Sequence, residues 1–173
     1  NVVLEGKVSI GSDSIISAGA VIRNSSLSKK IKVEPYSVIE NSKIGDNSMI
    51  GPFAHIGPGA ELANDVEIGN FVEVKRSTIS QKTKAKHLAY IGDGAIDSSV
   101  NVGAGTIFVN YDGKNKNKTK VGSNAFLGSN SSLIAPLIIG KNSMIGAGSV
   151  VTKNVPENKL ALARSRQKNI KKK

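Results

Sequence analysis

The residues of this chain that could do chemistry are few and lie close together in the sequence. His87, one of two histidines, follows a lysine-rich stretch and precedes Tyr90. A later segment, residues 110–120, begins with Asn110 and carries four lysines. Histidine moves protons near neutral pH, and lysine ammonium groups bind phosphates and other anions. The sequence therefore predicts a site for a small anionic molecule that uses two or three of these cations.

No cysteine accompanies these residues. Its absence excludes a disulfide framework, thiolate chemistry and a cysteine-based metal site. It also agrees with a reducing compartment, and neither a long apolar run nor a signal-peptide pattern is present. We therefore expect a cytoplasmic protein without a membrane span.

The formal net charge of +11 comes largely from the C-terminal end and the lysine-rich segment. Six of the last eleven residues are basic. A nucleic-acid-binding surface would place aromatic residues among such charges or use a known module. Neither is present, so nucleic acid is not expected as a partner.

An aliphatic residue recurs at every sixth position through much of the chain. The period holds from Val38 to Val74 and again from Val121 to Val151. In a chain with 18 glycines, this period is typical of a β-solenoid built from hexapeptide repeats. The predicted fold is all-β, with three hexapeptides in each triangular coil and parallel strands stacked from coil to coil.

Each repeat has the same design. An aliphatic side chain points into the coil, and Gly, Asn or Asp follows where the turn begins, because these residues tolerate a positive φ. The fifth position also points inward near a corner and is therefore small, as at Ser48, Ala54, Ala60, Ser143 and Ser149.

The period fails in three places, and loops projecting at such places are natural sites of function. These places lie near Lys29, between Val74 and Ile91, and from about Phe108 to Lys120. We expect His87 to lie beside an inserted segment in the second interruption, near the loop formed by the third.

The sequence predicts one repeat domain at residues 1–155 and a short basic tail at residues 156–173. Asn1 falls partway into a repeat, so we expect the chain to be part of a longer protein. In the tail, Leu160 and Leu162 are candidates to dock a short segment back on the solenoid.

Four stretches of the chain resemble the C-terminal domain of the bacterial bifunctional enzyme GlmU: residues 51–56, 68–75, 84–93 and 100–113. That enzyme joins a uridyltransferase to a glucosamine-1-phosphate N-acetyltransferase. The resemblance implies a left-handed parallel β-helix, a homotrimer with shared active sites, and an N-terminal uridyltransferase domain outside this chain. It also implies acetyl-CoA as co-substrate, no metal, and a role in UDP-N-acetylglucosamine and cell-wall biosynthesis.

The resemblance also assigns roles to individual residues. His87 matches the general base, and Glu73 matches a carboxylate that supports it. The positions that hold the sugar phosphate or close over the amino sugar are Lys75, Tyr90, Asn101, Asn110, Tyr111 and Lys116. The positions that bind acetyl-CoA are Ala104, Ser129, Ala147 and Arg164. Oxyanion donors are expected in the turn from Asn101 to Gly105, because a tetrahedral intermediate needs such donors.

Three positions depart from the GlmU pattern. Gly57 stands where the family has an arginine that holds the sugar phosphate, and charge-assisted hydrogen bonds contribute roughly 1.5–3 kcal/mol each. Lys86 replaces a small residue directly before His87, and Ala89 replaces a hydroxyl residue. His55 lies on the same strand as the missing arginine but is shorter.

Other functions follow from these departures or from the fold. One is a non-catalytic, trimerising or regulatory β-helix of a nucleotidyltransferase, and another is an acetyltransferase that Gly57 weakens or redirects. A carbonic anhydrase on this fold would need three histidine ligands, but only two histidines exist. An ice-binding helix would need a flat threonine array, which the sequence lacks.

Overall fold

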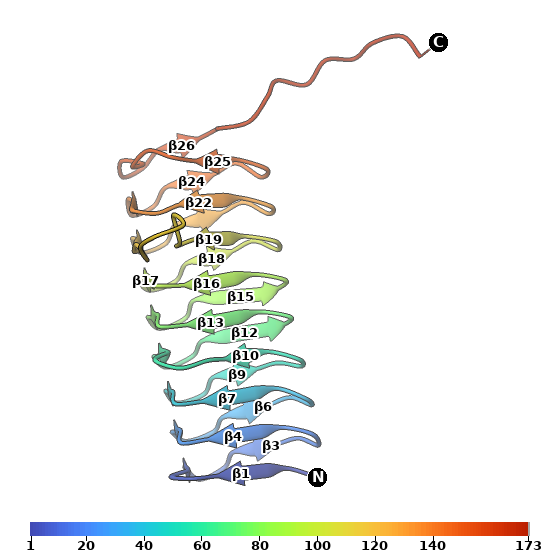
Figure 1. The fold of residues 1–173 in the computed structure, drawn as a ribbon, viewed down its shortest axis with the longest axis vertical. Helices are drawn as coiled ribbons and strands as arrows, with labels where there is room; N and C mark the ends of the chain where they lie inside the picture. The colour runs from blue at the N-terminus through green and yellow to red at the C-terminus, as the bar shows by residue number, and fades with distance from the viewer. Residues whose placement is uncertain (173) are drawn as a thin grey trace.

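The chain winds into a triangular β-solenoid whose coils stack along one axis (Figure 1). The computed structural model describes residues 1–172, and every strand pair between coils is parallel. Residues 1–172 form strands, turns and loops without a helix, and so contain none that could cross a membrane. Registered partners on successive coils lie 17 or 18 residues apart along most of the chain, as Val3, Val21 and Val38 show.

Three sheets form the three faces, here called A, B and C in chain order. Sheet A contains β1 (Val3–Glu5), β4 (Val21–Arg23), β7 (Val38–Glu40), β10 (His55–Ile56), β13 (Glu73–Lys75), β16 (Tyr90–Gly92), β19 (Ile107–Val109), β22 (Ser132–Ile134) and β25 (Val150–Val151). Sheet B contains β2 (Ser9–Ile10), β5 (Ser26–Leu27), β8 (Lys43–Ile44), β11 (Glu61–Leu62), β14 (Thr78–Ile79), β17 (Gly94–Ile96), β20 (Thr119–Val121) and β23 (Leu137–Ile139). Sheet C contains β3 (Ile15–Ile16), β6 (Lys32–Val33), β9 (Met49–Ile50), β12 (Glu67–Asn70), β15 (Lys84–His87), β18 (Asn101–Val102), β21 (Phe126–Leu127), β24 (Met144–Ile145) and β26 (Leu160–Ala161).

The core is the stack of aliphatic side chains that the hexapeptide period predicted. Ile44, Ile56 and Val74 are buried, as are almost all the other periodic positions. The exception is Val38, which is only half-buried, because its neighbour Ile39 occupies the interior instead. The small residues at the fifth position are buried as expected, since there is little room inside each corner.

The second interruption predicted from the sequence does not exist as an inserted segment. Residues 75–90 continue the coil through β14 and β15, which pair with the strands above and below. The period shortens from six residues to five between Val74 and Ile79, and both side chains point into the core. The sequence pattern is therefore broken by one shorter corner rather than by a loop.

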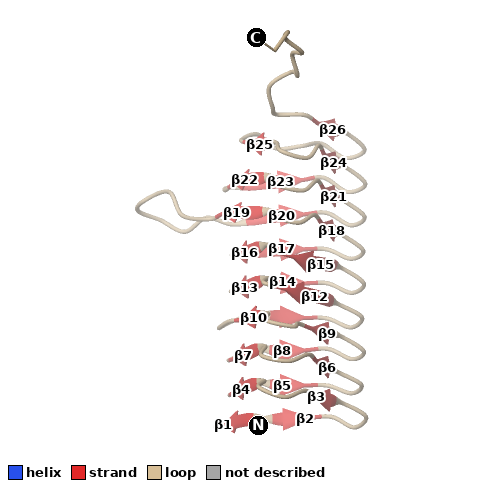
Figure 2. Cartoon of the chain, turned by 90° about the vertical axis from the view of Figure 1, so that its right-hand side faces the viewer, coloured by secondary structure: helices blue, strands red, loops and turns tan. Residues whose placement is uncertain are grey.

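The third interruption is a real loop. Between β19 and β20 the chain leaves the solenoid and projects outward as a hairpin (Figure 2). An antiparallel bridge between Tyr111 and Lys116 closes this hairpin. Within residues 1–172, the loop between β19 and β20 is therefore the candidate for a function that needs a projecting segment.

The C-terminal boundary also differs from the prediction. Strand β26 pairs with β24, so the solenoid continues beyond residue 155. The Val150 amide donates to the Ala163 carbonyl, and the Ala163 amide donates to Ser149 Oγ, so residue 163 is bonded to the coil below it. Residues 156–163 thus complete a last coil, and the chain leaves the solenoid after them (Figure 1).

The corner between sheets C and A changes character along the axis. In the N-terminal half it carries Tyr36, Phe53 and Phe71, which have positive φ and stack with ring centroids 5.4 and 5.5 Å apart. Leu88 takes the same place on the next coil, and Gly105 follows it. The residues at this corner are therefore bulky up to Leu88 and small from Gly105 onward, on the coil above His87.

The stacking of coils depends on glycines where two backbones meet. A Cβ built on Gly128 would lie 2.4 Å from the Ile145 carbonyl oxygen, whereas one on Gly57 would meet nothing closer than 3.4 Å. We expect Gly128→Ala to lower the free energy of unfolding by about 1–3 kcal/mol, because one coil must shift. Gly57→Ala should change it by no more than about 1 kcal/mol. Urea unfolding followed by circular dichroism measures both; equal midpoints would contradict this account of the corners.

Candidate active site

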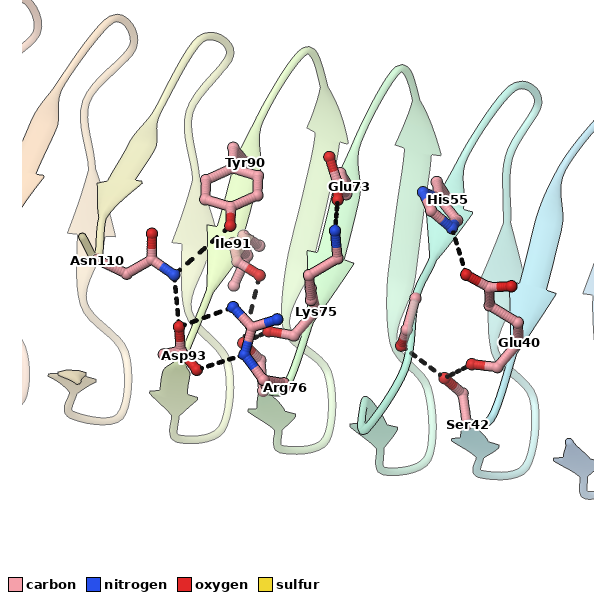
Figure 3. A network of polar contacts seen from close by, with 12 residues as sticks. Glu40, Ser42, His55, Glu73, Lys75, Arg76, Tyr90, Ile91, Asp93 and Asn110 are labelled. Carbon is pink, nitrogen blue, oxygen red and sulfur yellow. Dashed lines mark hydrogen bonds and ion pairs between the residues drawn. The ribbon is translucent and has the colours of Figure 1, made fainter. Parts of the chain in front are cut away.

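A buried carboxylate, that of Asp93 at the corner between β16 of sheet A and β17 of sheet B, holds neighbouring side chains in place (Figure 3). Arg76 donates two hydrogen bonds to Asp93, at 2.8 Å to Oδ1 and 2.9 Å to Oδ2. The Asn110 side-chain amide donates to the same carboxylate. The Arg76 guanidinium lowers the pKa of Asp93, with help from Asn110 and from Lys116, so Asp93 is ionised at neutral pH.

This arrangement fixes which way the Asn110 amide faces. Its nitrogen points to Asp93 and lies 3.5 Å from the Tyr90 hydroxyl oxygen, so its oxygen is left to accept a bond from elsewhere. Gly92 makes the contact between Tyr90 and Asn110 possible, because a Cβ there would lie 2.5 Å from the Tyr90 hydroxyl and 2.6 Å from the Asn110 nitrogen. Tyr90 and Asn110 therefore form one unit, supported by Asp93.

Next to this unit, Lys75 lies on β13 with its ammonium 2.6 Å from the Glu73 carboxylate. The hydrogen bond that Lys75 donates to Glu73 raises the pKa of Lys75, so Lys75 keeps its charge across the neutral range. On the coil below, His55 lies 3.2 Å from Glu40. Gly57 lies between these two pairs, and a Cβ there would make ordinary contacts, 3.4 Å from Lys75 Cε and 3.6 Å from His55 Nε2.

His87 lies at the end of β15, on sheet C beside the corner that leads to Tyr90. Its Nδ1 lies 2.8 Å from Oδ1 of Asn70, at the end of β12. A pocket of about 240 Å³ opens beside this pair on sheet C, lined on its apolar side by Met49, Pro52 and Ile68. The support expected from Glu73 is absent in this structure, since Glu73 bonds Lys75 and His87 bonds Asn70.

The projecting loop is closed by its own contacts. Asp112 Oδ1 accepts hydrogen bonds from the backbone amides of Lys114 and Asn115, and these lower the pKa of Asp112. The Tyr111 hydroxyl donates to the Gly113 carbonyl, and the Tyr111 ring is exposed. The loop therefore holds its shape while presenting Tyr111 outward.

The four residues matched to acetyl-CoA binding fall on one line along the solenoid axis. The Asn130 amide bonds the Ala104 carbonyl, and the Gly148 amide bonds the Ser129 carbonyl, so these turns stack at the corner between sheets C and A. Ala147 precedes Gly148 in the third of these turns, and Arg164 Cδ would lie 3.9 Å from a Cβ on Gly148. The small half of this corner therefore runs from the coil above His87 to Arg164.

One backbone hydrogen bond between coils is missing from the series along this corner. On the coils below, the turn amides bond the carbonyl of the preceding coil, as Phe71 does to Phe53 and Leu88 to Asn70. Within residues 1–172 the Gly105 amide has no such bond, although the Asn130 amide on the next coil does. The Gly105 N–H, one coil above His87, is thus a free donor in the turn expected to hold an oxyanion.

The structure brings most of the predicted residues into two groups. Glu73, Lys75, Tyr90, Asn110 and Lys116 gather on sheet A and its loop, and His87 lies across the corner from them. Asn101 is exposed on β18. It is in register with Lys84 of β15, the strand that carries His87. Asn70, Arg76 and Asp93 were not predicted. Asn and Asp after a repeat position, as at Asn70 and Asp93, resemble ordinary turn residues.

Residues 1–172 contain no cluster of three or more His, Cys, Asp or Glu side chains that could hold a metal ion. The two histidines bond Glu40 and Asn70 separately.

The chain matches the family described as bacterial transferase hexapeptide (six repeats) at residues 41–76 and 118–153. It is 51% identical over 167 residues to the bifunctional protein GlmU of Acinetobacter baylyi, covering 96% of this chain and 37% of that protein. It is 51% identical to GlmU of Thermodesulfovibrio yellowstonii over 170 residues, or 98% of this chain and 38% of that protein. The chain thus spans little more than a third of the length of these relatives and corresponds to their C-terminal part.

Solved structures share the fold. LpxA of Bacteroides fragilis, a UDP-N-acetylglucosamine acyltransferase, superposes with a TM-score of 0.80 at 19% identity, over 90% of this chain and 67% of that one. PerB of Caulobacter crescentus, solved with CoA and GDP-perosamine, has a TM-score of 0.60 at 25% identity, over 66% of this chain and 53% of that one. The solenoid is therefore a left-handed parallel β-helix, as predicted.

We expect the Arg76–Asp93 pair to affect how the free energy of unfolding depends on pH in acid. Because the pKa of Asp93 is lower in the folded protein, the unfolded chain takes up its proton first as the pH falls. The stabilisation from Asp93 is then complete above the unfolded value of about 3.9 and is lost as the pH falls towards the folded value. Urea unfolding between pH 2.5 and pH 7 should therefore show a smaller acid-induced loss in Asp93→Asn than in the parent.

Glu61→Gln is the matched control for this experiment, because Glu61 pairs with Lys43 at 2.9 Å on the exposed surface. Exposed pairs contribute little, so its pH dependence should follow the parent. Parallel curves for Asp93→Asn and the parent would contradict the role given to the buried pair.

Proposed function

This chain belongs to the GlmU family, of which it matches the C-terminal part, and on that premise we propose that it acetylates the amine of glucosamine 1-phosphate with acetyl-CoA. The product would serve UDP-N-acetylglucosamine synthesis for the cell wall. The observation that carries the proposal is the line of small residues that rises from the coil above His87 to Arg164.

The small half of the corner between sheets C and A suits a narrow, extended ligand. Ala104, Ser129 and Ala147 project little from three stacked turns, so the pantetheine arm of acetyl-CoA can lie along them. Arg164 at the far end is placed to meet the phosphates of the same molecule, since guanidinium groups bind phosphate with paired hydrogen bonds. The thioester would then lie near His87 and Gly105.

His87 supplies the proton transfer in this proposal. An amine attacks a thioester as the free base, and a neutral imidazole removes its proton as the new bond forms, which is worth roughly 10²–10⁴-fold in rate. The free Gly105 amide donates to the oxygen that becomes negative in the tetrahedral intermediate. Collapse of that intermediate releases the thiolate of CoA, which takes up a proton, and leaves the acetamide. No covalent acyl-enzyme is needed.

Sheet A provides the surface for the amino sugar phosphate. Lys75 and Lys116 supply positive charge, and the Tyr90 hydroxyl and the Asn110 amide oxygen remain able to bond a ligand. Glu73 neutralises Lys75, so an incoming phosphate has to compete with that carboxylate. Gly57 removes one more cation that GlmU proteins would offer here, and weaker phosphate binding is the expected consequence.

We propose that the protein acts as a homotrimer. One chain leaves Tyr111 and Arg164 exposed, together with the stacked rings at the corner between sheets C and A. Neighbouring subunits would close the site over both substrates. An N-terminal uridyltransferase domain is the further partner that the matched relatives suggest.

A second candidate is a β-helix that only assembles or regulates a nucleotidyltransferase. Gly57 favours it, because a phosphate site without its arginine is weakened. The presence of His87 across the corner from the Tyr90–Asn110 unit, which the Arg76–Asp93 pair supports, favours catalysis.

Release of CoA thiol from acetyl-CoA with glucosamine 1-phosphate tests the first proposal. We expect turnover, with a loss of about 10²-fold or more in kcat for His87→Ala. Gly57→Arg fits the structure, because a Cβ there has room, and it should lower KM for the sugar phosphate by about tenfold through a charge-assisted bond.

Lys7→Ala, on the first coil far from the site along the axis, serves as the control and should leave both constants unchanged. Absence of turnover in the parent and in Gly57→Arg at millimolar sugar would contradict the proposed reaction and leave the assembly role. Turnover gained only in Gly57→Arg would show that the missing cation alone had silenced the site.

A further inference from the structure

We propose that Asn70 is a positioning residue for His87, holding its imidazole as the tautomer with the proton on Nδ1 so that Nε2 is the base. The proposal rests on the proposed function for its kinetic consequence, but not for its structural claim. Neither the GlmU resemblance nor the sequence pattern singles out Asn70.

The sheet is extended at this one place to bring the two residues together. Strands β12 and β15 have four residues each, whereas the other strands of sheet C have two. Asn70 registers directly with His87 at the end of the extension. Gly69 permits the close approach, because a Cβ there would lie 2.0 Å from the Lys86 carbonyl oxygen.

The contact places an acceptor on one ring nitrogen. Asn70 Oδ1 lies 2.8 Å from His87 Nδ1, a normal length for a hydrogen bond in which Nδ1–H donates. The bond made by one ring nitrogen of histidine decides which nitrogen keeps the proton. With Nδ1 protonated, the lone pair of the neutral ring is on Nε2, the nitrogen that is left to face a substrate amine.

The charged groups around His87 are already paired with one another. Glu67 on β12 accepts from Lys84 at 2.8 Å and from Lys86 at 2.6 Å. Its carboxylate is thus occupied by the two lysines that flank Ala85 on the strand of His87. A neutral amide orients the ring without adding a charge. A negatively charged partner would instead hold the imidazolium proton more tightly.

An amide can face either way, and an aspartate distinguishes the two cases. A carboxylate can only accept, so Asn70→Asp preserves the bond if Nδ1–H is the donor and destroys it if the amide nitrogen donates. Asn70→Leu removes the bond while keeping a side chain of similar size. Asn154→Leu is the control, because Asn154 Oδ1 accepts one hydrogen bond of 2.8 Å, from the Ile138 amide, at an exposed position away from His87.

Nitrogen-15 NMR of histidine-labelled full chain gives the direct readout, with His87→Ala used to assign the signals of His87 and His55. At high pH the parent and Asn154→Leu should show His87 protonated on Nδ1, and Asn70→Leu should lose that preference. An Nε2–H tautomer in the parent would overturn the proposal. This readout stands even if the chain proves to have no acetyltransferase activity.

Kinetics give the second readout. We expect Asn70→Leu to lower kcat about tenfold, because one orienting hydrogen bond is lost. KM for both substrates should stay within about twofold of the parent. Asn70→Asp should recover most of kcat at high pH and move the acid limb of the pH–rate profile upward by about one unit, because the carboxylate favours the imidazolium. Parent-like kcat in Asn70→Leu, or Asn70→Asp as impaired as Asn70→Leu at every pH, would also overturn it.

Discussion

The parallel stacking of coils decides which residues of this chain can meet. Along most of the chain, registered residues on neighbouring coils lie 17 or 18 positions apart, and the main side-chain contacts of the candidate site follow this spacing. Asn70 meets His87, Arg76 meets Asp93 and Asn110 meets Asp93, each pair separated by 17 residues. The site is thus built along the axis, between coils, and its precision comes from the aliphatic core that fixes the distance from one coil to the next.

The fold could be predicted from the sequence because the hexapeptide period directly reports which side chains point inward. The same regularity hid two features. The period was misread at Val38, and one shorter corner between Val74 and Ile79 looked like an inserted loop. A change of one residue at a corner alters the spacing in the sequence without altering the architecture, so spacing alone could not distinguish a short corner from an insertion.

The site could be predicted only where residue types are unusual for a β-solenoid. The repeat does not require a histidine or a lysine-rich loop, so these residue types marked His87 and the segment after Asn110 as candidates. Asn70 and Asp93 occupy positions where many repeats carry Asn or Asp, and their roles depend on which side chain lies on the next coil. The resemblance to GlmU supplied the remaining site residues, and the geometry of one chain places most of them in two groups beside the corner that carries Leu88.

We propose that acetyl-CoA and an amino sugar phosphate meet at His87 from opposite sides of this corner. A crystal structure of the protein with CoA and glucosamine 1-phosphate tests it most directly. The pantetheine arm is expected along Ala104, Ser129 and Ala147, with the sugar amine within about 3 Å of His87 Nε2. CoA bound away from this corner, or an ordered sugar whose amine has no path to His87, would contradict the claim.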